Sequence, residues 1–400
     1  MLLRVTNGTT TVTLNDNSGS PTTPLAGAVY FPRDPGSQMY VTETARVGFA
    51  GSVATLRTVA NNLERLFAEA SDRNAPDVYV EYRPTDSGDV YRSPLTSDSR
   101  VVWPEEKGAR QMATTTSGGE FAAIFVRANY WEGPEAELAS GTIKNGTTSP
   151  YNILALSDPG GTMPCPLSLE VINATGGAIS PIDFYFNVDA YVGMTTNQHL
   201  LTTPTSVGTG GGTVYLFSVS ATVLAKWAGR DAQLILALST AFTGYIYAAA
   251  YTTISGVYQE VYRGSERYIS GRKLINLGSI PLPPGAQANT SFAVAAGVYG
   301  ASTLSTSFLQ IAPAENALNL HQIGYATADG TGVFEDGIER RAWAGTVGTR
   351  YEIVRRSGGP LLAYPGRSNR LHMLFDEGSN FTATRDMTVT VNARPRRATI

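Results

Sequence analysis

The sequence predicts a mainly β protein in which one amphipathic helix packs on the strands of the first domain. Short segments of β-forming residues recur along the chain, and turns rich in glycine and proline separate them, with 41 Gly and 22 Pro in 400 residues. Only 16% of residues are charged whereas 42% are hydrophobic, so the chain can bury a large core. One segment, GSVATLRTVANNLERLFAEA, has helical periodicity. Since this length exceeds what one core usually holds, we expect two domains.

The chain is expected to open as a β-hairpin. Asn7-Gly8 lies between the β-forming segments LLRVT and TTTVTL, and Asn-Gly favours the positive φ angles that a two-residue hairpin turn requires. A loop follows over residues 15–38, and MYVTETARVGF then alternates polar and apolar residues as a half-buried strand does.

The helix is predicted over about residues 52–71. Apolar side chains recur at intervals of three and four, and those expected in the core are Val53, Leu56, Leu63, Leu66 and Phe67. Ser52 is the expected N-cap, and the segment from Asn74 to Pro76 should end the helix.

Further strands are expected after the helix, and they complete a first domain over residues 1–135. They lie at residues 77–84, 90–91, 101–103 and 121–130, where Gly133-Pro134 ends the last one. The loops at 15–38 and 103–120 are long and polar. Our hypothesis is that they contact neighbouring subunits, although ordinary surface loops have the same composition.

Residues 136–151 form a polar segment without periodicity, which we interpret as a linker. The remainder, 152–400, is expected to be one β-sandwich of the jelly-roll or galectin-like type, because strands of about six residues recur between turns. Its predicted strands lie at 167–172, 183–192, 213–219, 233–238, 244–251, 291–296, 307–311, 350–354, 370–375 and 387–393, with a helical turn at 222–227.

Two groups of residues in this second domain are candidates for binding. The first is a dense row of tyrosines, of which Tyr245, Tyr247, Tyr258 and Tyr262 are candidates to face a glycan; sheet packing explains such a row equally simply. The second is Glu335-Asp336 with Glu339, whose carboxylates suit a cation, although an acidic turn in solvent is the simpler interpretation and we predict no metal.

Sequence motifs for catalysis are absent. His199, His321 and His372 are scattered, there is no HExxH or GxSxG motif and no Walker-type loop, and Cys165 between two prolines is expected to be a buried small side chain. A carboxylate pair brought together from distant strands stays open. We therefore expect no enzyme and no cofactor.

Charge and cysteine content limit the partners. The formal net charge is −3 and no basic stretch larger than ARPRR occurs, which argues against specific nucleic-acid binding. A single Cys165 allows no internal disulfide, and the sequence has neither a signal-peptide pattern nor about 18 consecutive apolar residues, so we expect folding in a cytoplasm and no membrane span.

The order of these segments resembles a known family. VTETARVGFAG leading into the helix that ends NLERLFAEA, then DVYVEYRP, VYRS and the closing RANYWEGPE are similar to the N-terminal domain of distal tail proteins of long, non-contractile tailed phages, a fold shared with tail-tube proteins. Towards the C-terminus, LAYPGRSNRL and MTVTVNARPR resemble the end of the β-sandwich that such proteins carry.

This resemblance implies a virion structural protein. It would be assembled in the host cytoplasm as a ring, which we expect to be a hexamer, and would join the tail tube to the tail tip or baseplate. The implied partners are the tail-tube protein and tail-tip hub proteins, with a host-surface glycan or receptor-binding protein as a further one, and phage DNA would pass through the lumen. Three alternatives stay open: a tail-tube subunit with a decorating domain, a glycan-binding tail adhesin, and a secreted glycan-active enzyme.

Overall fold

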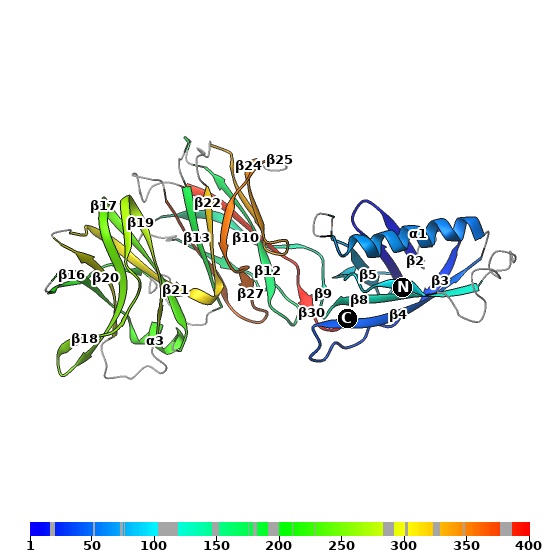
Figure 1. Cartoon of the computed structure of the whole chain (residues 1–400), viewed down its shortest axis with the longest axis horizontal. Coiled ribbons are helices and arrows are strands. Elements are labelled where there is room, and N and C mark those ends of the chain that lie inside the picture. The colour runs from blue at the N-terminus through cyan, green and yellow to red at the C-terminus, as the bar shows by residue number, and fades with distance from the viewer. Residues whose placement is uncertain are drawn as a thin grey trace. The chain divides into compact units, whose positions relative to one another are not determined.

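A computed structural model describes most of the chain, namely residues 1–16, 21–50, 53–72, 75, 77–102, 119–145, 152–174, 176–178, 182–190, 200–209, 211–227, 229–282, 292–300, 303–322, 329–346, 349–376 and 386–400. The chain divides into two compact units (Figure 1). Unit 1 comprises residues 1–135, 160–163 and 394–400, and unit 2 comprises residues 136–159 and 164–393. Both consist mainly of antiparallel strands, which confirms the predicted fold class.

Unit 1 contains two antiparallel sheets and the helix α1 (Val53–Glu69). The first sheet has the order β2-β1-β5-β6-β9-β30, and its strands are β1 (Leu2–Thr6), β2 (Thr11–Asp16), β5 (Tyr79–Arg83), β6 (Tyr91–Pro94), β9 (Trp131–Glu132) and β30 (Arg396–Arg397). The second has the order β3-β4-β8-β7, and its strands are β3 (Leu25–Val29), β4 (Tyr40–Phe49), β7 (Arg100–Val102) and β8 (Gly119–Ala128). Part of the loop expected at 15–38 is therefore strand β3, while residues 103–118 lie outside the described residues.

The opening hairpin forms, but its loop is longer than predicted. Thr6 pairs with Thr11, so four residues rather than two connect β1 and β2. The side-chain oxygen of Asn7 accepts hydrogen bonds from the backbone N–H groups of Thr9 and Thr10 at 3.0 and 2.7 Å, and Gly8 has φ 84°. The Asn side chain therefore caps a wider turn in place of the two-residue turn.

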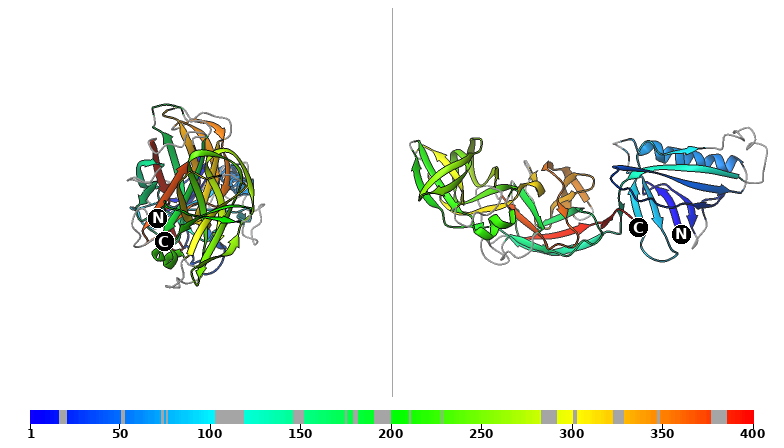
Figure 2. Two further views of the ribbon diagram at one scale, coloured as in Figure 1. Left: turned by 90° about the vertical axis from the view of Figure 1, so that its left-hand side faces the viewer. Right: turned by 90° about the horizontal axis from the view of Figure 1, so that it is seen from below.

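Helix α1 buries one face in the core that both sheets of unit 1 share, and it runs along the strands (Figure 2). Leu56, Leu63, Leu66 and Phe67 are at most 3% exposed, and the Phe67 ring packs edge-on against Phe125 at 6.2 Å. Val53 begins the helix, whereas Ser52 lies outside the described residues.

The segment expected to be a linker is largely a strand. Residues Ala136–Lys144 form β10 and pair along their whole length with β29 (Asp386–Ala393). Leu138 and Ile143 point into the core of unit 2 while Gly, Ser and Thr occupy other positions, so the strand's apolar pattern is too sparse to recognise in the sequence. The last residues of the chain return to unit 1, where β30 pairs with β9.

Unit 2 contains a sandwich whose core lies between two antiparallel sheets. The first has the order β10-β29-β12-β23-β24-β25, with β27 also pairing with β12; besides β10 and β29 its strands are β12 (Cys165–Asn173), β23 (Gly332–Asp336), β24 (Arg341–Thr346), β25 (Thr349–Ile353) and β27 (Leu362–Ala363). The second has the order β11-β28-β13-β22-β26, and its strands are β11 (Ile153–Leu156), β13 (Ile182–Ala190), β22 (Ala317–Gln322), β26 (Arg355–Gly358) and β28 (Asn369–Phe375).

The prediction of one sandwich for residues 152–400 misses a part of unit 2, because a further eight-stranded sheet is inserted between β13 and β22. This sheet curls around its own core (Figure 1). Its elements are β14 (Leu200–Leu201), β15 (Thr205–Thr209), β16 (Gly212–Ser218), α3 (Ala221–Trp227), β17 (Asp231–Ile254), β18 (Val257–Arg263), β19 (Arg267–Pro281), β20 (Phe292–Tyr299) and β21 (Thr306–Pro313), and a 3₁₀ turn, η2 (Ala314–Asn316), leads back to β22. The segments predicted at 233–238 and 244–251 belong to one strand, the 24-residue β17.

Candidate functional site

Four large apolar side chains between the end of β3 and the start of β4 are exposed on unit 1. Val29, Phe31, Met39 and Tyr40 are 59%, 78%, 72% and 52% exposed, and we call these four side chains the β3 surface. Large apolar side chains gathered in one short segment differ from the scattered exposed residues that soluble proteins usually carry. Among the described strands β3 pairs only with β4, while on its other side it lies close to β2 without pairing with it.

A buried ion pair holds the segment that carries this surface. The Arg127 guanidinium on β8 donates to both carboxylate oxygens of Glu43 on β4, at 2.7 and 2.8 Å, and both side chains are at most 1% exposed. Glu43 also accepts hydrogen bonds from the Tyr30 hydroxyl and, at 2.6 Å, from the backbone N–H of Arg33. Burial, followed by the neighbouring Glu43 carboxylate, raises the pKa of Tyr30 well above its usual value. The connection from β3 to β4 is thereby fixed to the sheet beneath it.

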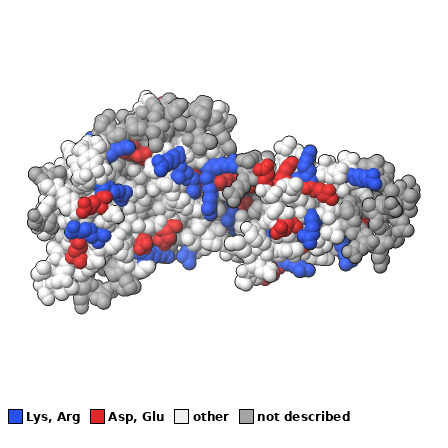
Figure 3. Space-filling model, viewed as in Figure 1, with Lys and Arg blue, Asp and Glu red and all other residues white. Residues whose placement is uncertain are grey.

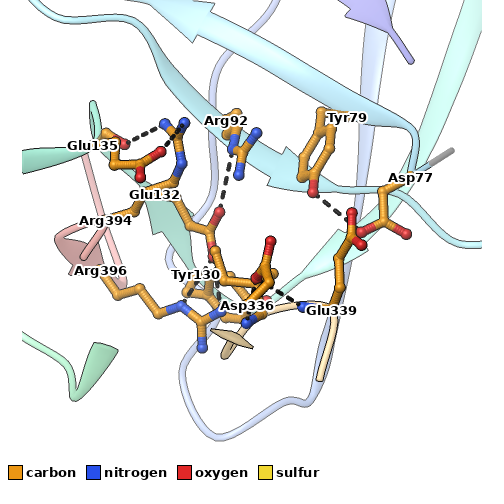
Figure 4. A network of polar contacts seen from close by, with 12 residues as sticks. Asp77, Tyr79, Arg92, Tyr130, Glu132, Glu135, Asp336, Glu339, Arg394 and Arg396 are labelled. Carbon is orange, nitrogen blue, oxygen red and sulfur yellow. Dashed lines mark hydrogen bonds and ion pairs between the residues drawn. The ribbon is translucent and has the colours of Figure 1, made fainter. Parts of the chain in front are cut away.

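A second polar cluster in unit 1 fixes the end of the chain (Figure 4). The Glu132 carboxylate, 1% exposed, accepts hydrogen bonds from Arg396 at 2.7 Å and from Arg92 at 3.2 Å. Arg396 also stacks on the Tyr130 ring at 3.9 Å and donates to its hydroxyl. Through this carboxylate Arg396 ties β30 to β9, and Arg92 ties β6 to the same strand.

The tyrosine row of unit 2 divides into exposed and buried rings. Tyr245 and Tyr268 are 54% and 59% exposed and form an edge-on ring pair at 5.2 Å, and Tyr258 is 39% exposed. Tyr262 is half-buried against the core of the curled sheet. Tyr247, however, is 3% exposed, because its ring lies over Gly297 and under Tyr299 and Arg263. Tyr247 therefore cannot present a ring face to a sugar.

The predicted acidic group does not converge on a common point. Glu335 is buried and pairs with Arg356 at 2.9 Å, whereas Asp336 accepts the backbone N–H groups of Ile338 and Glu339 at 2.9 and 3.1 Å. Across the residues that the structure describes, no three His, Cys, Asp or Glu side chains gather closely enough to hold a metal ion. Cys165 is buried in the sandwich core.

The burial of Glu335 predicts a pH dependence of stability. Burial raises the pKa of Glu335 from 4.5 to about 7, with the Arg356 guanidinium opposing the shift. In the unfolded chain the Glu335 carboxyl loses its proton near its usual pKa of 4.5, whereas in the folded chain it keeps the proton up to about pH 7. The stabilisation of the folded state that is present below pH 4.5 is therefore lost as the pH rises through about 7. This difference between the pKa values of Glu335 in the folded and unfolded chain corresponds to a change of about 3 kcal/mol in the free energy of unfolding.

We expect the free energy of unfolding in urea to fall less for Glu335→Gln than for the wild type when the pH is raised from 5 to 8. The substitution Glu339→Gln, at an exposed turn, is the control and should leave the wild-type pH dependence intact. Equal pH dependence in the wild type and Glu335→Gln would contradict this assignment.

The three histidines have different environments. His372 is fully buried, and burial lowers its pKa to about 3, so it is neutral at physiological pH. His199 lies outside the described residues. His321 lies on β22 and makes hydrogen bonds through both ring nitrogens.

Charges of both signs are interspersed on the face drawn in Figure 3. Many lie in ion pairs, such as Arg263 with Glu260 at 2.8 Å and Lys144 with Asp386 at 3.0 Å. Of the helices described, none combines the length and the apolar character that crossing a bilayer requires.

Comparison with known proteins gives no match, either to a model of a protein family or to a curated protein.

Proposed function

We propose that this protein is a ring-forming structural subunit of a phage tail, in which unit 1 assembles with further copies of itself through the β3 surface. The observation that carries the proposal is the group of exposed apolar side chains Val29, Phe31, Met39 and Tyr40, which lie on β3, on β4 and on the segment between them. Exposed apolar side chains gathered in one segment favour association, and association through different surfaces of each copy closes into a ring when the rotation allows.

The rigid attachment of this surface supports the same proposal. An interface loses less conformational entropy on binding when its side chains are already held in place. The ion pair of Glu43 with Arg127, together with Tyr30, fixes the segment between β3 and β4 before any partner binds. The order of elements in unit 1, which resembles that of distal tail proteins, suggests a hexamer between the tail tube and the tail tip, with the tail-tube protein and hub proteins as neighbours.

Electron microscopy of the purified full chain, combined with light scattering, tests this function. The wild type should form rings with a lumen, and Phe31→Asp combined with Met39→Asp should give monomers with unchanged thermal unfolding, because both side chains are exposed. Val261→Asp, at an exposed apolar position of unit 2, is the matched control and should still form rings. Stacked tubes would favour the tail-tube alternative, and a monomeric wild type would rule out both.

A further inference from the structure

Three neighbouring strands of the sandwich bring together side chains that are distant in the sequence. On β13 and β22, Asp183 lies directly opposite His321. On β22 and β26, His321 lies opposite Arg355 and Asn319 lies opposite Ser357. Residues that face each other across antiparallel strands share one face of the sheet, as do residues two apart on one strand. All five side chains therefore lie on the same face.

The central histidine is hydrogen-bonded on both sides. Its Nδ1 lies 3.2 Å from Oδ1 of Asp183, and its Nε2 lies 3.3 Å from Oγ of Ser357. This is the order of contacts in which a carboxylate orients an imidazole and the imidazole takes a proton from a serine hydroxyl. The His321 side chain is 28% exposed and Ser357 is exposed, so a substrate in solvent can reach both.

The inserted sheet helps to fix the carboxylate. Arg272 on β19 lies 3.7 Å from Asp183 and pairs with Asp376 at 2.5 Å. The backbone N–H of Asp376 donates to the backbone carbonyl of Asp183 at 2.8 Å. Asp183 is 17% exposed and is thus held between the histidine and the arginine.

Two further groups on this face can stabilise negative charge. Asn319 lies opposite Ser357, and within the described part of the chain Oδ1 of its amide is buried without a hydrogen-bond partner. Its N–H group is of the kind that stabilises the oxyanion of acyl transfer. Arg355 is exposed, and among the described residues its guanidinium has no carboxylate within ion-pair distance.

We propose that Ser357, His321 and Asp183 catalyse the hydrolysis of short-chain carboxylic esters, an activity independent of the proposed ring function. The Ser357 hydroxyl attacks the ester carbonyl while His321 takes its proton. The tetrahedral intermediate collapses, His321 returns the proton to the departing alkoxide, and an alcohol leaves with the acyl group on Ser357. Water then attacks the acyl-serine, with His321 again accepting and returning a proton, and releases the carboxylic acid. Ser357 and His321 are the catalytic residues, and Asp183 is a positioning residue.

The full chain is tested with p-nitrophenyl acetate and with a fluorophosphonate that labels activated serines. We expect saturable hydrolysis and a label on the peptide that contains Ser357. Ser357→Ala should abolish both while leaving thermal unfolding unchanged. Ser270→Ala, at an exposed serine on β19, is the matched control and should retain both.

Two variants test the roles of the supporting groups. Asn319→Ala should lower kcat by about 100-fold, since this is the usual effect of removing one oxyanion donor. Asp183→Asn should lower kcat with little change in KM, because it disturbs the orientation of His321 and not ester binding. Absence of hydrolysis and labelling in the wild type, or Ser357→Ala hydrolysing as fast as the wild type, would overturn the proposal.

Discussion

Leu63→Asp is expected to prevent unit 1 from folding. Leu63 is 0% exposed at the centre of the face that α1 packs against both sheets, and the substitution both removes its apolar contacts and buries a carboxylate without a partner. The combined cost is about 5 kcal/mol or more, which is comparable to the whole stability of a domain. Limited proteolysis with mass spectrometry should find cleavage throughout residues 1–135 while fragments from unit 2 persist.

The control introduces the same residue on the other face of the same helix. Asn61 is exposed, so Asn61→Asp should give the wild-type digestion pattern. A soluble, ring-forming Leu63→Asp protein would contradict both the packing of α1 and the proposed role of unit 1 in assembly.

The second large effect is expected at the buried ion pair. Arg127→Met removes the cation and leaves the Glu43 carboxylate 1% exposed with no opposite charge beside it. Breaking such a pair from one side costs about 3–5 kcal/mol. Denaturant unfolding of unit 1 should show this loss, and adding Glu43→Gln to Arg127→Met should restore part of it.

A surface ion pair of the same unit provides the comparison. Arg65 and Glu69 lie one helical turn apart at 3.7 Å, with 56% and 28% of their side chains exposed. Because solvent screens such pairs, Arg65→Met should cost less than about 1 kcal/mol. If Arg65→Met destabilised the protein as much as Arg127→Met, the buried pair would have no special structural role.

The elements that the sequence predicts well are those with a strong local signal. Residues 53–69 of the predicted helix have clear helical spacing, and Asn7-Gly8 marks a turn between two β-forming segments. Strand β10 escapes prediction because only its Leu138 and Ile143 lie in the core of unit 2, so its apolar pattern is sparse. The inserted sheet is missed for another reason: β13 and β22 are neighbours in space, but more than 120 residues separate them in the sequence.

The candidate surfaces were predictable to a lesser degree. Composition identifies the tyrosine row, but alternation in β17 does not reveal that Tyr245 stays exposed beside Tyr268 while Tyr247 is buried beneath Tyr299 and Arg263. His321 has no sequence motif around it, since Asp183 and Ser357 are 138 and 36 positions away. Only strand register places these three side chains together.

The return of the chain to unit 1 has a consequence for synthesis. Domains generally fold in order as they leave the ribosome, the N-terminal one first. Here the first sheet gains its last strand, β30, only when residues 396 and 397 have been translated, long after Glu132 on the neighbouring strand has emerged. Until then the outer edge of β9 stays unpaired, and the Glu132 carboxylate has Arg92 but not yet Arg396 as a partner. Completion of the first sheet of unit 1 is thus coupled to synthesis of unit 2, because the residues of unit 2 are translated before β30.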